Sequence, residues 1–448
     1  MTRRIRKHLS LLSVFTGLGH LPEHREQSEK SGSSIGETGR APSLPSATLY
    51  IHRRTPMIFN SFDYYLLFLF PAALIFKLAS IKWRPWVLSI SAALFYLYFS
   101  LNGFGGIAGA ICLSIFLWEC FVSRWYQQRA AICLFGVAQS ILFLVVFKYW
   151  NYLTGLIWWA SLRNPWHWPG AFLPLGISFF TFEFIHYAVD RYRGKAAAGS
   201  AAEYLAFIMF FPTMVAGPIK RYEDFLPKLR LAEAGAIDLE IGITRILVGL
   251  VKKFAVADLM TAFTVHLNRA DIAIASRGVL PLWLLAYGIK IYFDFAGYSD
   301  IAIGSARLFG IQVPENFDWP YLRSNIAEFW RYWHISLSRW LLDYVFIPLG
   351  GSRAARLRIY ANLLATMLVS GVWHGAGTNF AVWGLWHGML LTGHRIWRDL
   401  RPDRTPTVGR QVFGGVLTFV LVNIGWAFFC MDLPTARFFF LRLFIGAS

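Results

Sequence analysis

The stretch FWRYWHISLSRWLLDYVFIPLGG at residues 329–351 and two apolar stretches after it decide how this chain is interpreted. The later stretches are LLATMLVSGVWHGAG (363–377) and VWGLWHGMLLTGH (382–394), beyond a basic link. Each stretch places a histidine directly after a tryptophan, and these histidines are His334, His374 and His387. An ionisable side chain is costly in an apolar segment, so each histidine is a candidate functional residue. The alternative for any one of them is a structural role, with the ring hydrogen-bonded to a backbone carbonyl.

The composition is that of a membrane protein rather than a soluble one. Of the 448 residues, 56% are hydrophobic and only 15% are charged, whereas a soluble domain has about 25% charged residues. Apolar runs close to transmembrane length recur along the chain, at about 62–79, 85–101, 104–122 and 130–149 in its first part. These runs predict an all-α, polytopic membrane protein.

Basic residues account for the formal net charge of +18. They lie in short links between apolar runs, at 80–84, 123–129 and 191–195, and in a cluster at 219–230. Lys and Arg are enriched in cytoplasmic loops, where they also meet anionic lipid head groups. We therefore expect these segments in the cytoplasm, with membrane lipids and no nucleic acid as partners. Lys148 ends the fourth run on the opposite side, and we interpret it as a side chain that reaches the membrane interface.

The four cysteines lie in apolar runs without metal-ligand spacing, at Cys112, Cys120, Cys133 and Cys430. This placement predicts packing residues rather than a disulfide or a zinc site. We expect no bound metal.

Residues 1–56 differ in composition from the rest of the chain. They are polar and rich in Ser, Gly and Pro, with the mixed-charge run HREQSEK, which is typical of disorder. Met57 then opens the apolar sequence MIFNSFDYYLLFLFP. We expect 1–56 to be a disordered leader, or sequence upstream of a true start at Met57, and 57–448 to form a transmembrane domain.

The segment EYLAFIMFFPTMVAGPIKR (203–221) is apolar but is interrupted by Pro212 and by Gly217-Pro218. A full crossing would carry the basic cluster after it to the outside, against the positive-inside rule. A broken, re-entrant segment returns the chain to the cytoplasmic side. Non-helical backbone at membrane depth is tolerated only where protein or a cavity covers it, so this segment predicts a central cavity.

Charged and titratable residues also lie inside the apolar runs. Glu183 and His186 fall on one helical face, either as an acid–base pair or as a structural contact between helices. Lys290 and Asp294 lie one helical turn apart and are expected to pair, which lowers the cost of both charges. Asp300 has no evident partner in the sequence, so it is a candidate substrate-tunnel residue.

Two of the histidines have a predicted structural setting. Residues 325–343 have the periodicity of one amphipathic helix, with Trp333 in its apolar stripe and His334 on the apolar side. His374 ends an apolar run, and Gly375 follows it. A glycine lets the backbone turn sharply and lets a substrate come close.

These stretches resemble the membrane-bound O-acyltransferase family, and within it the bacterial branch typified by the membrane subunit of alginate O-acetyltransferase. The resemblance covers essentially Met57 to the C-terminus. Besides 329–351, the matching motifs are LPLGISFFTF (173–182), FPTMVAGPIKR (211–221), YFDFAGYSDIAIGSARLFGI (292–311), VSGVWHGAG (369–377) and WGLWHG (383–388). Motifs of this length in this order are far more specific than one short pattern.

The resemblance implies a helical bundle with re-entrant and amphipathic helices around a central tunnel, in a bacterial inner membrane. It also implies that His374 is the catalytic histidine and that His334 is a second polar residue of the tunnel. The supporting candidates around them are Trp333, Trp373, Gly375, Asp300 and His387, the last with a mainly structural role. Chains of this family carry further hydrophobic sequence near their end, so we expect the last helices to be missing.

The implied reaction moves an acetyl group from cytoplasmic acetyl-CoA to hydroxyls of an exopolysaccharide or cell-wall polymer outside, usually with a periplasmic partner. We expect no bound cofactor. A neutral histidine can accept the proton of the attacking hydroxyl, since its unperturbed pKa lies near ~6.5. The sequence has no Gly-x-Ser-x-Gly elbow, so direct transfer is favoured over a covalent intermediate on Ser336, Ser338 or Ser370.

Two alternatives remain open. A D-alanyl or other acyl transferase of the same superfamily would share every motif and would differ in donor and acceptor. A membrane transporter would also have broken helices and buried charges around a midplane site, but the hydropathy of this chain shows no internal repeat.

Overall fold

The computed structural model describes residues 58–99, 106–157, 174–401 and 407–446. Within these ranges every regular element is helical and no strand is present, which confirms the all-α class. The expected leader, 1–56, lies outside the described residues.

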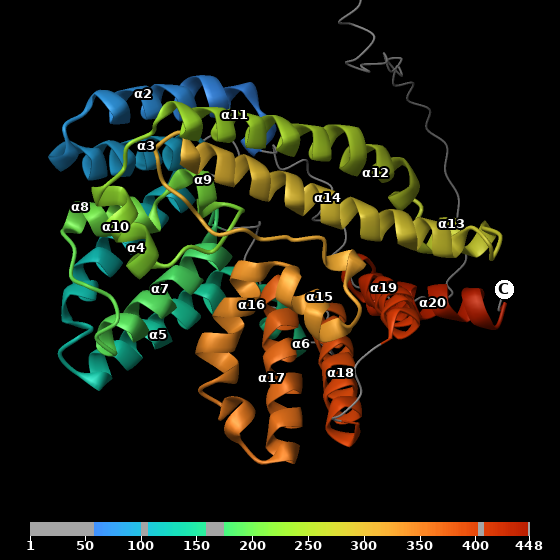
Figure 1. Cartoon of the computed structure of the whole chain (residues 1–448). Coiled ribbons are helices and arrows are strands. Elements are labelled where there is room, and N and C mark those ends of the chain that lie inside the picture. Colours follow the sequence, from blue (N-terminus) through green and yellow to red (C-terminus); the bar gives the residue numbers. More distant parts are fainter. Residues whose placement is uncertain (1–57, 100–105, 158–173, 402–406, 447–448) are drawn as a thin grey trace, which may run out of the picture. The chain divides into compact units, whose positions relative to one another are not determined.

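The helices of the first part of the described chain lie close together (Figure 1), and the core between them is rich in aromatic residues. These helices are α2 (Phe70–Leu78), α3 (Arg84–Phe99), α4 (Gly106–Val122), α5 (Ala130–Leu144), α6 (Trp150–Ile157), α7 (Ile177–Tyr192), α8 (Ala201–Ile208), α9 (Phe211–Met214) and α10 (Tyr222–Arg230). α3 contacts α4 and α8, and α5 packs along α7. Large rings fill the space between them; Phe95 and Phe116, for example, are fully buried.

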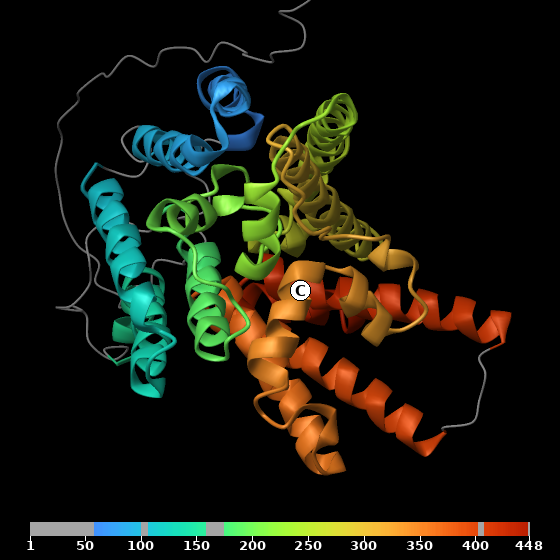
Figure 2. The same cartoon turned by 60° about the vertical axis from the view of Figure 1, so that its left-hand side comes forward.

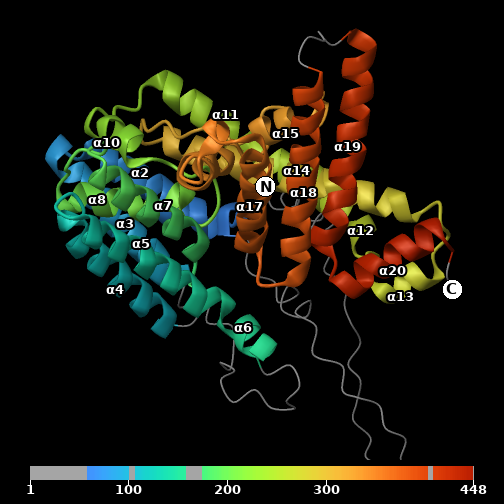
Figure 3. The ribbon, with the colours of Figure 1, turned by 90° about the horizontal axis from the view of Figure 1, so that it is seen from below.

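The second part is organised around one long helix and a crossing pair. Its helices are α11 (Ala236–Val251), α12 (Asp258–Thr264), α13 (Arg269–Ile274), α14 (Leu280–Arg307), α15 (Ile326–Tyr332), α16 (Ile335–Leu341), α17 (Arg356–His374), α18 (Thr378–Leu400), α19 (Val408–Cys430) and α20 (Leu433–Phe444). α11 and α12 lie along α14, whereas α17 and α18 run beside each other and crosswise to α14 (Figures 1 and 2). Seen from below, α19 lies next to α18, on the side away from α17 (Figure 3).

Two helical segments of the described chain are long and apolar enough to cross a membrane, Ala130–Ile157 and Val408–Cys430. Both keep large apolar side chains on the outside; Leu134 in the first and Phe413 in the second are 69% and 70% exposed. Exposed apolar faces of this kind suit contact with lipid or another protein. The expected runs at 85–101 and 104–122 form the shorter helices α3 and α4, of 16 and 17 residues.

The break predicted within 203–221 is confirmed. α8 and α9 are separate helices, with Pro212 in the first turn of α9, and the chain is then non-helical until α10 begins. In this non-helical part Gly217 has a φ of +129°, and a Cβ there would lie only 2.9 Å from the Cβ of Ala302 in α14. A glycine is therefore needed where the segment passes against α14.

Glycine pairs bring α11 and α14 into close contact. A Cβ at Gly249 would lie 2.6 Å from the carbonyl oxygen of Gly297, and a Cβ at Gly297 would lie 2.8 Å from the carbonyl oxygen of Gly249. Gly242 faces Gly304 in the same way, with a Cβ at Gly242 placed 2.9 Å from the carbonyl oxygen of Gly304. Small residues at such interfaces let helix backbones approach, which drives helix association where lipid weakens the hydrophobic effect.

The same kind of contact holds α17 against α18 next to His374. Gly371 lies one turn before His374, and a Cβ on it would lie 2.9 Å from the Cα of Gly384 in α18. A Cβ at Gly384 would in turn meet the carbonyl oxygen of Met367 and lie 3.1 Å from the Cα of Gly371. The contact fixes the end of α17, and therefore the position of His374.

We predict that Gly384→Ala separates α17 from α18 and lowers the free energy of unfolding by about 1–3 kcal/mol, the usual cost of overpacking. The matched control is Gly393→Ala in the same helix, where no atom lies within 4 Å of the added Cβ. Its effect is a gain of up to about 1 kcal/mol from helix propensity. Thermal unfolding of the purified variants, followed by tryptophan fluorescence, measures both. A Gly384→Ala variant as stable as Gly393→Ala would contradict the close contact.

Candidate active site

A cavity of about 360 Å³ lies where α14, α17 and the junction of α15 with α16 meet. It is lined by Lys148, Ser178, Phe179, Ile291, Asp294, Phe295, Tyr298, Trp333, His334, Trp373, His374, Trp383, Trp426 and Phe429. Four of the predicted site residues therefore line one cavity, namely His334, His374, Trp333 and Trp373. The other three, Gly375, Asp300 and His387, are not part of its lining.

His374 is the last residue of α17, as the sequence predicts. Aromatic rings surround its imidazole: the centroids of Trp373, Trp383 and Phe429 lie 4.8, 5.1 and 5.1 Å from that of the histidine. All three pairs meet edge to face, a geometry that packs rings tightly. The imidazole thus lies at a wall of the cavity where aromatic side chains limit access of water.

Trp373 lines the cavity next to both histidines. Its indole stacks on Phe182 of α7, with ring centroids 4.9 Å apart, and its Nε1 donates to the carbonyl oxygen of Ser178 at 3.2 Å. The His334 ring lies 6.4 Å from the same indole, centroid to centroid. Trp373 therefore lies near both His334 and His374 and is itself held by α7.

The role expected for Gly375 is not supported. Its φ is −163°, which is extended backbone open to any residue. A Cβ there would instead collide with the ring of Phe380, whose Cζ would lie 2.6 Å away. The glycine makes room for a phenylalanine of α18 rather than for a substrate.

The single helix predicted for 325–343 is wrong, because the chain breaks at His334. α15 ends at Tyr332 and α16 begins at Ile335, while His334 adopts the left-handed conformation with φ +43°. This conformation is unfavourable for a residue with a Cβ and persists only where the surroundings enforce it. Apolar periodicity is continuous on both sides, and no Gly or Pro marks the break, so the sequence pattern did not reveal it.

The His334 ring points into the cavity wall without a polar partner. Its side chain is buried, 1% exposed, and neither Nδ1 nor Nε2 has a hydrogen-bond partner in the part of the chain that the structure describes. The ring packs edge to face on Phe295 of α14, with centroids 4.6 Å apart. Since a buried polar group without a partner is costly, a structural role for this histidine is disfavoured and a substrate contact is favoured.

Asn316, in the loop between α14 and α15, holds the break at His334. Its backbone carbonyl accepts from the Ile335 N–H at 2.9 Å. Its side-chain Oδ1 accepts from the Ser336 Oγ at 2.7 Å, and its Nδ2 donates to the Ser299 Oγ of α14 at 3.1 Å. The residues directly after His334 are therefore tied to α14 through one buried asparagine.

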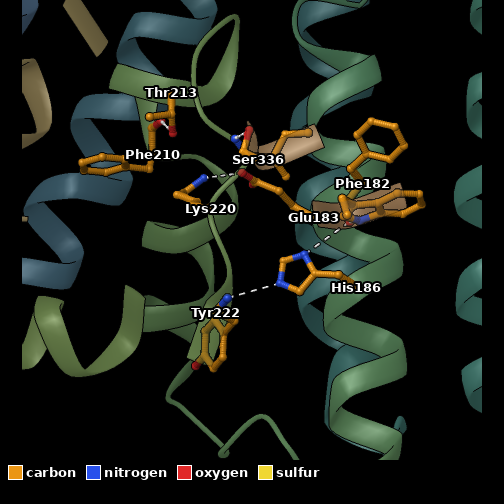
Figure 4. Close-up of polar contacts among 10 residues, drawn as sticks. Phe182, Glu183, His186, Phe210, Thr213, Lys220, Tyr222 and Ser336 are labelled. Atoms are coloured by element: carbon orange, nitrogen blue, oxygen red, sulfur yellow. Dashed lines mark hydrogen bonds and ion pairs between the residues drawn. The ribbon is translucent and has the colours of Figure 1, made fainter. Parts of the chain in front are cut away.

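A second set of buried contacts attaches the non-helical segment before α10 to α16 and α7 (Figure 4). The Ile219 N–H donates to the Ser336 Oγ at 2.9 Å, and Lys220 pairs with Glu183 of α7 at 2.5 Å. Figure 4 also shows His186, whose Nε2 accepts from the Tyr222 N–H at 3.2 Å. Glu183 thus binds the segment and His186 binds the first residue of α10, which favours the structural alternative for them over an acid–base pair.

Asp300 is not an unpartnered carboxylate. Arg245 of α11 and Lys252 bind its two oxygens at 2.7 and 2.5 Å. It lines a different cavity, of about 280 Å³, together with both basic residues. Its partners lie on a neighbouring helix, about 50 residues away in sequence, so no local sequence signal pointed to them.

The pairing predicted between Lys290 and Asp294 is also wrong. Asp294 pairs with Lys253 at 2.8 Å, whereas the Lys290 Nζ lies 3.5 Å from the Thr264 Oγ1. Lys253 belongs to a π-helical turn, η8 (Lys252–Ala257), that follows α11. Helical spacing within α14 suggested the wrong partner because the nearer cation comes from the adjacent helix. Asp294 lines the cavity of the two histidines and was missed as a site candidate.

His387 is fully buried in α18, outside the lining of the cavity. Its Nδ1 accepts from the Trp330 Nε1 at 3.3 Å, and its ring is edge-on to that of Trp383 at 4.9 Å. These contacts favour the structural role expected for it.

Lys148 was misinterpreted from the sequence. It lies in the π-helical turn η7 (Val145–Tyr149), and its Nζ donates to the Ser178 Oγ at 3.1 Å and to the carbonyl oxygen of Trp373. The side chain therefore turns inward to the cavity instead of reaching the membrane interface. A lysine inside so apolar a helix was the signal that could have found it.

Among the described residues no group of three or more His, Cys, Asp or Glu side chains is arranged to hold a metal ion. The four cysteines are unpaired, and Cys112, Cys120 and Cys133 are buried. Burial of these three side chains suits a packing role.

Comparison with known proteins identifies the class. Residues 90–433 match the model of MBOAT, the membrane-bound O-acyltransferase family. The chain therefore belongs to this family, and it is a membrane protein and an O-acyltransferase. This confirms the resemblance found in the sequence and decides for acyl transfer over the transporter alternative.

The relatives are bacterial enzymes that modify different polymers. The chain is 36% identical over 382 residues to the probable alginate O-acetylase AlgI of Pseudomonas aeruginosa, covering 83% of this chain and 72% of the relative. It is 30% identical to the peptidoglycan O-acetyltransferase of Helicobacter pylori, over 76% of this chain and 70% of the relative. It is 31% identical to the teichoic acid D-alanyltransferase of Bacillus subtilis, over 83% of this chain and 97% of the relative.

We predict that Asn316→Ala lowers acyl transfer about 10²-fold, because a small displacement of a site residue has that effect. The control is Asn268→Ala, which removes a different asparagine bond, the N-cap of α13 to the Asp271 N–H at 3.0 Å. Asn316→Ala loses its side-chain bonds to Ser336 and Ser299, and Asn268→Ala loses the capping bond and the two bonds of its Nδ2. At about 1 kcal/mol for each bond, thermal stability falls in both variants. Turnover by purified protein measures the difference. Equal activity of the two variants would contradict the role of Asn316.

Proposed function

We propose that the cavity between His334 and His374 is where an acyl group passes directly from a thioester donor to a hydroxyl of a polymer. The observation that supports this most is the arrangement of the two histidines. Each belongs to a separate sequence stretch, and they flank the Trp373 indole in one cavity lined mainly by aromatic side chains. Acyl transfer needs a base near the alcohol and a site that excludes water, and this arrangement supplies both.

In this proposal His374 is the general base. Its ring nitrogen accepts the proton of the attacking hydroxyl as the oxygen forms a bond to the thioester carbonyl carbon. The carbon–sulfur bond then breaks, and the leaving thiolate is protonated by the imidazolium. His334 contacts the substrate with its unpartnered ring nitrogens. Of the serines weighed as nucleophiles none lines the cavity, which supports direct transfer.

For the substrates we propose acetyl-CoA on the cytoplasmic side and hydroxyls of an exopolysaccharide or cell-wall polymer outside, with a periplasmic partner completing the transfer. The names of the relatives from Pseudomonas aeruginosa and Helicobacter pylori support acetyl as the acyl group and a polysaccharide as the acceptor. We further propose that the chain is multi-pass in the inner membrane and that the cavity is part of a tunnel. The basic segments at 80–84, 123–129, 191–195 and 219–230 then face the cytoplasm.

The second candidate is D-alanyl transfer. It is favoured by the Bacillus subtilis relative, of which this chain covers 97%, compared with 72% of the alginate O-acetylase. The two candidates differ in donor, so the donor that supports turnover distinguishes them.

We predict that His374→Ala lowers transfer by roughly 10²–10⁴-fold, the usual contribution of a positioned acid–base group. His334→Ala also impairs transfer, with a further effect on donor binding. His387→Ala is the control, since its ring is buried outside the cavity lining. Each purified variant is supplied with labelled acetyl-CoA, or a D-alanyl thioester, and polysaccharide acceptor. If His374→Ala keeps near-normal turnover while His387→Ala abolishes it, His387 is the general base and the proposal is wrong.

A further inference from the structure

Lys148 occupies an unusual position for a charged residue. It lies inside the helical segment Ala130–Ile157, which is long and apolar enough to cross a membrane. At this point the helix widens into the π-helical turn η7, Val145–Tyr149. Single π turns inside α-helices occur frequently at functional sites, and a cation in an apolar helix is retained only where it has a specific use.

The contacts of Lys148 leave its charge without a carboxylate. Its Nζ donates to the Ser178 Oγ at 3.1 Å and to the backbone carbonyl of Trp373. Among the described residues no Asp or Glu oxygen forms an ion pair with it. The two almost fully buried lysines differ in this respect, since Lys220 pairs with Glu183 and Lys253 with Asp294. The carbonyl end of α17 supplies a partial negative charge next to the ammonium, and the ring centroids of Tyr149 and Trp373 lie 5.6 and 5.5 Å from its Nζ.

The ammonium group is also held next to the reacting groups. Lys148 lines the same cavity as His334 and His374, and the carbonyl it binds belongs to the residue directly before His374. An ammonium has three N–H donors, and two of them are used by Ser178 and Trp373. Within the described part of the chain no hydrogen bond uses the third donor, which leaves it for a group in the cavity.

We propose that Lys148 is a catalytic residue that stabilises the oxyanion formed during acyl transfer; the assignment rests on the function proposed above. When the hydroxyl oxygen bonds to the thioester carbonyl carbon, the carbonyl electron pair moves to its oxygen and the hydroxyl proton moves to His374. The remaining N–H of Lys148 donates to that oxygen. The electron pair returns to form the carbonyl again when the carbon–sulfur bond breaks, and the leaving thiolate takes the proton from His374. A donor already fixed by two other bonds needs no reorganisation during this step.

The alternative is that Lys148 only caps the end of α17, and Tyr149 provides the matched control for it. The Tyr149 hydroxyl donates to the carbonyl oxygen of Val372, one residue before the carbonyl bound by Lys148. Tyr149 is not part of the cavity lining. Tyr149→Phe therefore removes a bond to the same helix end and leaves the cavity unchanged.

The experiment compares Lys148→Met, Lys148→Arg and Tyr149→Phe as purified proteins, with thiol release and acyl transfer measured at saturating donor. Acetyl-CoA and a D-alanyl phosphopantetheine thioester are both tried, with alginate oligosaccharides as acidic acceptor and cello-oligosaccharides as neutral acceptor. We expect Lys148→Met to lower kcat by about 10²–10³-fold, the effect of removing one oxyanion donor, with KM for the donor nearly unchanged. We expect Lys148→Arg to lower kcat less than Lys148→Met does. Tyr149→Phe should keep kcat close to normal, with a thermal stability similar to that of Lys148→Met.

A chemical-rescue experiment distinguishes loss of the N–H donor from loss of side-chain packing. In Lys148→Ala, added propylammonium raises kcat, whereas tetramethylammonium, which has the charge but no N–H, does not. The proposal is overturned if Lys148→Met keeps its kcat or if Tyr149→Phe loses as much activity. It is also overturned if Lys148→Met only raises KM for the acidic acceptor, because Lys148 then binds an acceptor carboxylate. Near-normal turnover by His374→Ala would instead remove the proposed function itself, so the two failures are distinguishable.

Discussion

Every charge buried among the apolar helices of this protein must find a partner within the protein, and this constraint explains much of the structure. Lys220 and Glu183 are 2% and 3% exposed and form a pair at 2.5 Å that attaches the broken segment to α7. Lys253 meets both Asp258 and Asp294, at 2.7 and 2.8 Å, where α11 passes into its π turn. Such pairs contribute little net stability, but removing one partner costs about 3–5 kcal/mol. They therefore fix which helices lie next to one another.

Two polar side chains without such a partner line the same cavity. The ring nitrogens of His334 have no partner among the described residues, and Lys148 has no carboxylate partner there. His334 is also held in a left-handed conformation, with φ +43°, by bonds from the following residues to Asn316. Strain and unsatisfied polar groups persist where function requires them. Together with His374 at the end of α17, they make the cavity a site where a substrate supplies the missing contacts.

The helices, the break in 203–221 and the two histidines of the cavity could be predicted from the sequence, because apolar runs, prolines and Trp-His steps are local signals. The partner of Asp300 could not, since Arg245 and Lys252 come from another helix. The break at His334 was hidden as well. It is imposed by Asn316 from a distant loop, and the apolar periodicity of 325–343 continues through it. Local sequence patterns thus predict most of the helices, whereas contacts between helices determine the ion-pair partners and the backbone conformation at the site.

The most direct test of the account is a structure of the protein with a non-reactive thioether analogue of its acyl donor, in which a ketone replaces the thioester. The account predicts that the ketone carbon lies in the cavity between the rings of His334 and His374, beside Trp373. Density for the acyl end in the second cavity, next to Asp300 and Arg245, or outside both cavities, would contradict it.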